Sequence, residues 1–192
     1  SNSVRAIMQD KYGFLWIGTE EGLNRYDGIM IKSYSICPQA AGKYISSLYG
    51  TKKNIWIGTD EGIYIYAYAT ETFTYFDLTT PNNVRITSIV NHILQDKDGN
   101  LWFSTNGQGL FRYNLSKNYL EQYEFTSAFG IVASTMADSD NQIWALTNQG
   151  ESGVYKLNKA ENKFETFPLS YESGKHDSNA LVMLEDSEHT LW

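Results

Sequence analysis

The residues best suited to binding a small molecule are carboxylates and amides in the loops that follow each tryptophan-containing strand. Polar residues on neighbouring strands accompany them. Together these residues are Arg5, Glu20, Glu21, Asp60, Glu61, Asn91, His92, Asn106, Gln108, Asn148, Gln149 and Glu151. Such side chains can hydrogen-bond a hydroxyl-rich ligand such as a sugar when aromatic rings lie beside them. The same residues would also suit an acidic rim in contact with water, and the sequence leaves both interpretations open.

Residue types that catalyse hydrolysis or hold metals do not form a recognisable motif. His92, His176 and His189 are scattered, without i,i+4 pairing or a Cys partner, which argues against zinc. The sequence contains no nucleophile elbow, no phosphate-binding loop, no paired-carboxylate motif and no calcium loop. We therefore expect no catalytic residue, no metal and no cofactor, and we expect His92 to be a hydrogen-bonded core residue.

Tryptophan marks a repeat along the whole chain. All five tryptophans, which lie 40, 46, 42 and 48 residues apart, have the same local setting: Trp16, Trp56, Trp102, Trp144 and Trp192. Four of them are followed three residues later by threonine: Thr19, Thr59, Thr105 and Thr147. A hydroxyl that recurs in every unit is better explained by a structural bond to a turn than by catalysis.

Each unit divides into four short strands, A to D, which predicts an all-β fold. Strand A is expected at 4–9, 44–49, 90–95, 132–137 and 180–185, with an apolar residue eight positions before each tryptophan that should pack between units: Met8, Leu48, Leu94, Met136 and Leu184. Four antiparallel strands repeated at this period are typical of a β-propeller blade. We predict one partial propeller over 1–192, with four four-stranded blades at about 4–34, 44–76, 86–125 and 130–167, and a truncated fifth at 178–192.

The turn between strands A and B carries aspartate at positions 10, 96, 138 and 186. Aspartate bonds its own backbone in such turns. Gly50 replaces it in the second unit, so that turn must close differently. The indole N–H that follows also needs an acceptor when it is buried.

Composition limits the possible partners. The net charge is -7 and the 15 Lys and Arg residues are scattered, which argues against nucleic acid. Cys37 is the single cysteine, so no internal disulfide can form. No apolar run approaches the roughly 18 residues that cross a bilayer, and we expect no membrane contact by this segment.

The residues L-W-I-G-T-x-x-G-L-x-x-Y-D resemble the repeat of two-component-regulator propellers. The match runs almost unbroken from Asp10 to Asp27, persists in the second and third units, and weakens in the fourth, where Ala145-Leu146 replaces Ile-Gly. The resemblance implies part of the periplasmic sensor region of a bacterial hybrid two-component histidine kinase. Such a parent is anchored in the inner membrane, and the sensor region binds glycan breakdown products and signals to a kinase elsewhere in the chain.

Three functions remain as alternatives. The first is a non-catalytic sensor module that binds an oligosaccharide, the second a scaffold propeller that binds another protein, and the third a propeller lyase or hydrolase. Four blades and a fragment of a fifth would leave two open blade faces. We therefore expect self-association, either as a dimer of the parent or by covering of these faces.

Overall fold

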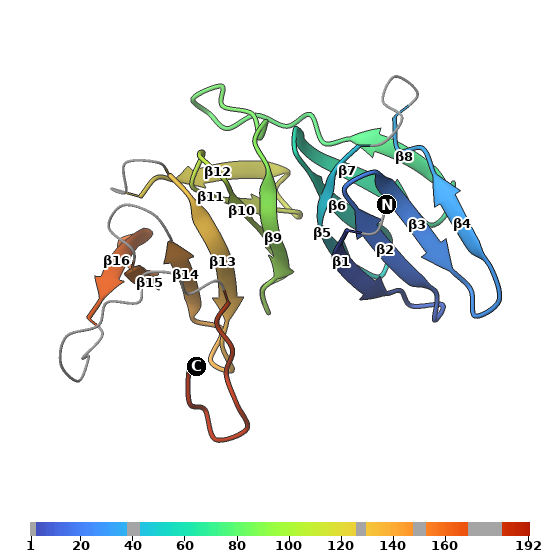
Figure 1. Cartoon of the computed structure of the whole chain (residues 1–192). Coiled ribbons are helices and arrows are strands. Elements are labelled where there is room, and N and C mark those ends of the chain that lie inside the picture. The colour runs from blue at the N-terminus through green and yellow to red at the C-terminus, as the bar shows by residue number, and fades with distance from the viewer. Residues whose placement is uncertain (1–2, 38–42, 126–129, 148–152, 169–181) are drawn as a thin grey trace. The chain divides into compact units, whose positions relative to one another are not determined.

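The computed structural model describes residues 3–37, 43–125, 130–147, 153–168 and 182–192 (Figure 1). Its regular elements are sixteen β-strands, and none of the described residues forms a helix. It follows that no helix in this part of the chain has the length and hydrophobicity to span a bilayer. The chain divides into two compact units, Ser1–Thr79 with Asn83–Ile93, and Thr80–Asn82 with Leu94–Trp192.

The first unit contains two antiparallel four-stranded sheets. Their strands pair in sequence order, β1-β2-β3-β4 and β5-β6-β7-β8. The bounds are β1 Val4–Gln9, β2 Leu15–Thr19, β3 Gly22–Tyr26, β4 Ile31–Tyr34, β5 Ile45–Gly50, β6 Asn54–Thr59, β7 Gly62–Ala67 and β8 Thr72–Tyr75. The two sheets lie side by side, with β5 against β1 and β2 (Figure 1).

The remaining strands form two more sheets of the same kind. Their orders are β12-β11-β10-β9 and β13-β14-β15-β16. The bounds are β9 Val90–Gln95, β10 Leu101–Thr105, β11 Leu110–Asn114, β12 Tyr119–Tyr123, β13 Val132–Ala137, β14 Ile143–Thr147, β15 Gly153–Asn158 and β16 Lys163–Phe167. Four such sheets along one chain are propeller blades, so the predicted all-β propeller fold is confirmed.

Burial explains why the second strand of each blade carries the repeat. All five residues of β10 are buried, whereas three of the four residues of β4 are exposed. A strand covered on both faces needs apolar residues at successive positions, and an outer strand does not. Trp16 belongs to the core between the first two blades, together with Ile45 and Ile55.

The repeated aspartate and tryptophan are joined by a hydrogen bond. The indole Nε1 donates to the aspartate Oδ2 six residues earlier at 2.8 Å in three blades and 2.7 Å in the last hairpin, in the pairs Trp16–Asp10, Trp102–Asp96, Trp144–Asp138 and Trp192–Asp186. In the second blade, where Gly50 replaces the aspartate, the Thr51 hydroxyl accepts from the backbone N–H of Asn54 at 3.0 Å. This turn therefore closes through a hydroxyl, as its sequence required.

The repeated threonine ties the next turn. The Thr59 hydroxyl donates to the Gly62 carbonyl oxygen at 2.9 Å and accepts from the Glu61 N–H at 3.2 Å. Thr19, Thr105 and Thr147 donate to the carbonyl oxygen of the glycine at the equivalent place. These hydroxyls therefore form structural hydrogen bonds within their own turns.

The chain's last segment departs from the prediction. Glu185 bridges Leu191 in a short antiparallel hairpin, and residues 182–184 are not in a strand. Leu184 is 53% exposed and Trp192 is 72% exposed, so the expectation that they pack between units is wrong for this hairpin. No further sheet among the described residues lies against it. Trp16 and Trp102, by contrast, are buried in clusters that include residues of the next blade.

Candidate ligand-binding site

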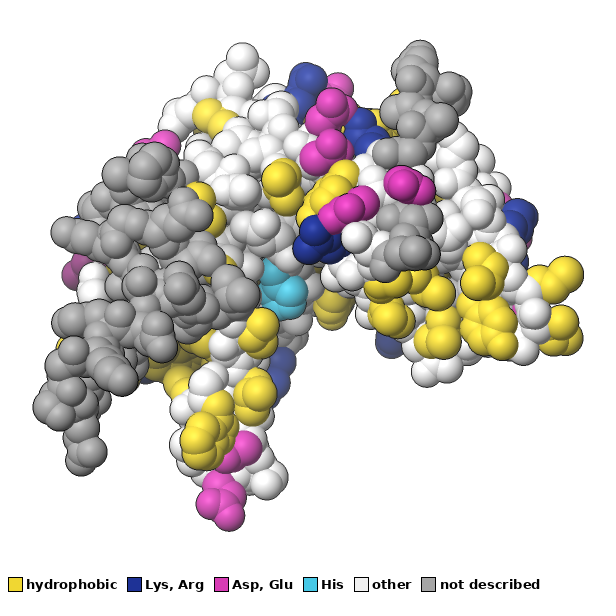
Figure 2. Space-filling view, viewed as in Figure 1, with side chains coloured by type: hydrophobic (Ala, Val, Ile, Leu, Met, Phe, Trp, Pro, Cys, Tyr) yellow, Lys and Arg dark blue, Asp and Glu magenta, His cyan; other side chains and the backbone are white. Residues whose placement is uncertain are grey.

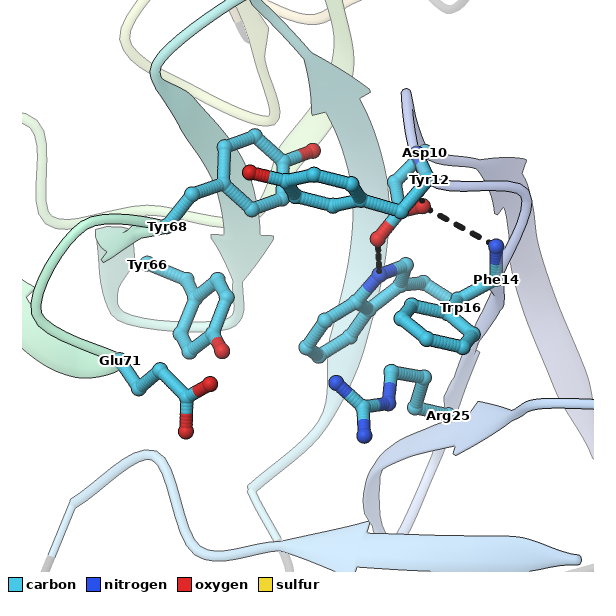
Figure 3. Close-up of a pocket in the computed structure, with 8 residues that line it drawn as sticks. All are labelled: Asp10, Tyr12, Phe14, Trp16, Arg25, Tyr66, Tyr68 and Glu71. Atoms are coloured by element: carbon cyan, nitrogen blue, oxygen red, sulfur yellow. Dashed lines mark hydrogen bonds between the residues drawn. The ribbon is translucent and has the colours of Figure 1, made fainter.

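A cavity of about 240 Å³ lies in the first unit between the first two blades, at the end of the strands where the β1–β2 and β7–β8 turns meet (Figure 3). Its lining is mainly aromatic, with three charged residues: Asp10, Tyr12, Phe14, Trp16, Arg25, Tyr66, Tyr68 and Glu71. This is the opposite end of β2 from Glu20 and Glu21, where the sequence predicted the ligand face.

Its inner wall is fixed by packing and by the Asp10 carboxylate. The rings of Trp16 and Tyr66 are buried, with centroids 5.0 Å apart. Asp10 Oδ1 accepts from the backbone N–H groups of Tyr12 and Phe14 at 2.9 and 3.0 Å, while Oδ2 accepts from the Trp16 indole. Asp10 thus positions the wall, and its oxygens are occupied by protein donors.

Arg25 brings a positive charge to the cavity. Its guanidinium carbon lies 4.4 Å from the centroid of the Phe14 ring, an arrangement that favours a cation. Its Nε is buried without a hydrogen bond, and the residue opposite it on β4 is Lys32. Among the described residues Arg25 makes no ion pair, although its charge contributes to lowering the pKa of Asp27, after the backbone N–H groups of Met30 and Ile29.

Tyr68 adds a hydroxyl that has no hydrogen-bond partner among the described residues. Its oxygen is buried without a hydrogen bond, and burial raises the pKa of Tyr68 to about 12. The phenol is therefore protonated at neutral pH and available as a donor. Its ring meets Tyr12 edge-on at 5.5 Å, and Lys11 Nζ lies over both rings while donating to the Lys52 carbonyl oxygen at 2.7 Å.

Glu71 forms the opposite side of the cavity from an unusual backbone position. Its φ is 52°, in the left-handed region, where the third and fourth blades have Asn118 at 49° and Asn162 at 52°. This conformation costs most L-residues about 1–2 kcal/mol, and asparagine tolerates it better. Figure 3 shows the Glu71 carboxylate and the Arg25 guanidinium facing the cavity from neighbouring sheets.

The second unit has the same arginine at the same register, but there it is neutralised. Arg112 pairs across strands with Glu121, as Arg25 pairs with Lys32, and Arg112 Nη2 lies 2.5 Å from Glu121 Oε2. Asn162 Nδ2 donates to Glu121 Oε1 at 2.6 Å, and the Tyr123 hydroxyl donates to Asn162 Oδ1 at 2.7 Å. This network satisfies the guanidinium and links the third and fourth blades.

The arrangement in the first unit can therefore hold a small anionic group. Arg25 offers a guanidinium, which suits a carboxylate or sulfate, and Tyr68 offers an aromatic ring. Pockets for drug-sized ligands occupy roughly 300–1,000 Å³. A cavity of about 240 Å³ fits a smaller group, of the size of one sugar ring.

The predicted ligand residues of the first unit lie in other places. Arg5, at the start of β1, pairs with Glu20 in the β2–β3 turn, and the hydrogen bond from Arg5 lowers the pKa of Glu20. Glu61 pairs with Lys43. The remaining members lie on the exposed B–C turns or on half-buried positions of β9: Glu21, Asp60, Asn91 and His92.

The other predicted residues belong to the second unit. Asn106 is exposed and bridges Ile131, while the half-buried Gln108 accepts from Gln122 Nε2 through its carbonyl oxygen at 2.9 Å. Asn148, Gln149 and Glu151 lie outside the described residues, as does His176. None of the predicted ligand residues lines the cavity of Figure 3, and their proposed role stays a prediction.

Sequence reasoning missed Arg25, Tyr12, Tyr68 and Glu71. The signal was present, since residues that differ between units at equivalent positions are the better functional candidates. Lys32 stands where the third blade has Glu121, and Glu71 where the fourth has Asn162. Both exchanges lie outside the predicted set of ligand residues.

The family comparison agrees with the repeat. The profile of the two-component regulator propeller matches residues 1–21 and 83–107. These two stretches are therefore similar to two-component regulator propeller repeats. The chain is also similar to a histidine kinase of Formosa agariphila, which is 28% identical over 149 residues, covering 73% of this chain and 10% of that protein. The chain therefore spans about a tenth of the length of that relative.

Several solved structures superpose on nearly the whole chain. The extracellular domain of a hybrid two-component system from B. thetaiotaomicron is 25% identical, with a TM-score of 0.80 over 99% of this chain and 25% of that one. A second such domain from the same organism has a TM-score of 0.82 at 24% identity, over 100% of this chain and 27% of that one. Virginiamycin B lyase from Staphylococcus aureus shares the fold alone. It is 17% identical, with a TM-score of 0.75 over 99% of this chain and 62% of that one.

Proposed function

We propose that this chain is a ligand-sensing part of the extracytoplasmic, periplasmic region of a sensor histidine kinase, and that its ligand is a glycan fragment. The observation that carries the proposal is the combination of repeat and fold. The chain matches the regulator propeller profile, and 99% of it superposes on an extracellular domain of a hybrid two-component system. In this role the propeller binds the ligand and a kinase elsewhere in the parent protein transmits the signal.

The cavity in the first unit supports ligand binding. It combines aromatic rings with the guanidinium of Arg25 and the carboxylate of Glu71 within one sugar-sized space. Sugar rings stack on aromatic faces and hydrogen-bond planar polar groups, so these residue types suit a saccharide. The carboxylates predicted from the sequence offer a second surface, although Glu20 and Glu61 are already paired with cations.

The test is a binding measurement. The 192-residue chain is titrated calorimetrically with a panel of neutral and acidic oligosaccharides from plant, fungal and animal polysaccharides. We expect at least one to bind with a one-to-one stoichiometry. A panel in which no saccharide binds the folded chain would contradict the glycan proposal.

We propose that the chain itself is not an enzyme. Among the described residues no group of His, Cys, Asp and Glu is placed to hold a metal. His189 Nδ1 lies 2.9 Å from Ser139 Oγ and 3.0 Å from Glu185 Oε1, so both partners meet the same ring nitrogen. A relay triad uses the two ring nitrogens separately. Chromatography of the bound saccharide after prolonged incubation should show no product.

A protein-binding scaffold is the second candidate, because one surface favours it. Ile29, Met30 and Ile31, in and after the β3–β4 turn, are 88%, 67% and 65% exposed. Figure 2 shows hydrophobic side chains gathered over the sheet β1–β4. If the sensor function is right, replacing Ile29 and Met30 with serine should leave saccharide binding unchanged. If the scaffold function is right, the same double variant should no longer bind the protein partner.

A further inference from the structure

We propose that the cavity between the first two blades is the site for one acidic sugar unit, and that Arg25 binds its carboxylate or sulfate group. This inference rests on the proposed function and specifies where the glycan binds and which charge it carries. It does not use the loops that the sequence singled out, which lie at the other end of the blades. Three observations carry it: an unpaired guanidinium, its neutralised counterpart in the second unit, and the size of the space.

The first step concerns the charge of Arg25. A half-buried guanidinium that forms no ion pair lowers the free energy of unfolding unless an anion pairs with it. The Nε of Arg25 is buried without a hydrogen bond, and the facing strand supplies Lys32, a second cation. Stacking on Phe14 at 4.4 Å fixes the plane of the guanidinium but does not satisfy its donors.

The second step compares the repeats. If the blade required an arginine at this register to be unpaired, Arg112 would be unpaired too. Instead Arg112 is bound by Glu121, and Asn162 of the next blade binds that carboxylate in turn. At the corresponding positions the first two blades have Lys32 and Glu71, which leave the guanidinium available. The same framework is thus completed by protein in one place and left open for an external anion in the other.

The third step counts the charges that face the site. Asp10 is occupied by the indole of Trp16 and two backbone N–H groups, and Lys11 is directed to the Lys52 carbonyl oxygen. Glu71 faces the cavity from the neighbouring sheet without pairing with Arg25. An anion at Arg25 would therefore leave Glu71 to accept hydrogen bonds from ring hydroxyls.

The fourth step concerns what carries the anion. A cavity of about 240 Å³ is much larger than a free sulfate or carboxylate requires, and its walls are the rings of Tyr12, Phe14 and Tyr68. Space of this kind beside a single cation fits a ring that stacks on aromatics and bears a single acidic group. A uronate and a sulfated sugar share this chemistry.

The test is calorimetric titration of the chain with four probes: galacturonate, galactose 6-sulfate, neutral galactose and inorganic sulfate. We expect at least one acidic sugar to bind about tenfold or more tightly than galactose, because a charge-assisted bidentate contact is worth at least that factor. The affinities of galacturonate and galactose 6-sulfate identify which acidic group the site accepts. Inorganic sulfate should bind more weakly than the preferred acidic sugar, since it makes no ring contacts.

Two variants test the role of Arg25 independently. Arg25→Met should reduce the affinity for the acidic sugar to that for galactose. Lys32→Glu changes an exposed residue outside the cavity lining and should do the same, because a glutamate there can pair with Arg25 as Glu121 pairs with Arg112. Arg112→Met and Lys117→Glu are the matched controls in the second unit, and both should leave the affinity unchanged.

The outcomes separate this inference from the proposed function. If galactose and the acidic sugars bind equally, or if an acidic sugar binds and neither Arg25→Met nor Lys32→Glu weakens it, the assignment of Arg25 is wrong while saccharide binding stands. If inorganic sulfate binds as tightly as the acidic sugars, the site takes a free anion and the sugar assignment is wrong. If neither these probes nor the oligosaccharide panel bind, the proposed function itself fails.

Discussion

Replacing Asp96 with alanine should destabilise the second unit strongly. The Asp96 carboxylate accepts from the Asn100 backbone N–H at 2.8 Å, from Asn100 Nδ2 at 2.9 Å and from the Trp102 indole at 2.8 Å. Trp102 is 1% exposed, so water cannot replace the acceptor of its indole N–H. The variant therefore leaves a buried donor unsatisfied, in addition to losing the bonds that close the turn.

The magnitude follows from these contacts. A hydrogen bond to a charged group contributes about 1.5–3 kcal/mol, and a buried donor left unpaired costs about 1–3 kcal/mol. The bonds to Asn100 count for less, because this half-buried residue regains water. We expect a loss of about 3 kcal/mol in the free energy of unfolding, which for a chain of this size lowers the Tm by about 6–12 °C.

Urea unfolding followed by tryptophan fluorescence and circular dichroism measures the loss. Asp186→Ala is the matched control, because it removes the same indole bond from Trp192, which is 72% exposed and can bond water instead. Its effect should be much smaller. A loss below about 1 kcal/mol for Asp96→Ala, or equal losses for the two variants, would refute the argument that burial gives this bond its value.

Other perturbations test other parts of the structure. Gly62→Ala should destabilise the chain more than Gly22→Ala in thermal unfolding, although both glycines have positive φ. The new Cβ would lie 2.5 Å from the Ile86 carbonyl oxygen at position 62, whereas it meets nothing within 4 Å at position 22. Tyr68, with a pKa raised to about 12, should ionise late in a 295 nm absorbance titration, and the stability it contributes should be complete below pH 10 and lost as the pH rises towards 12. If the chain self-associates through the face of the first blade that carries Ile7, which is 65% exposed on β1, Ile7→Glu should weaken the association and light scattering should show a shift towards the monomer; an unchanged mass would exclude that face.

The repeat could be predicted because its signals are local. Trp16 and Asp10 lie six residues apart in one hairpin, and Thr19 bonds the turn that directly follows it. Such bonds depend on short stretches of chain, so their pattern is visible as recurring residue types. The same locality accounts for the turn at Gly50, where the neighbouring Thr51 supplies the replacement.

The cavity could not be located in the same way. Whether an arginine on β3 is neutralised depends on its partner on β4 and on a turn of the next blade, as Glu121 and Asn162 show for Arg112. These residues are up to 50 positions away in the sequence, and only the strand register brings them together. Without that register, the sequence does not distinguish Arg25 from the other cations of an acidic chain.

By itself the sequence determined the period, the four strands of each blade and the recurring positions of aspartate and tryptophan, because hairpins and alternating burial are governed by interactions between near neighbours. Only the tertiary structure decided that the first two blades leave Arg25 and the Tyr68 hydroxyl unpartnered beside a cavity, while equivalent positions in the second unit are closed by Glu121 and Asn162. The physical reason is that charge neutralisation acts through space between strands and blades, where a single exchange such as lysine for glutamate reverses the result without disturbing the repeat.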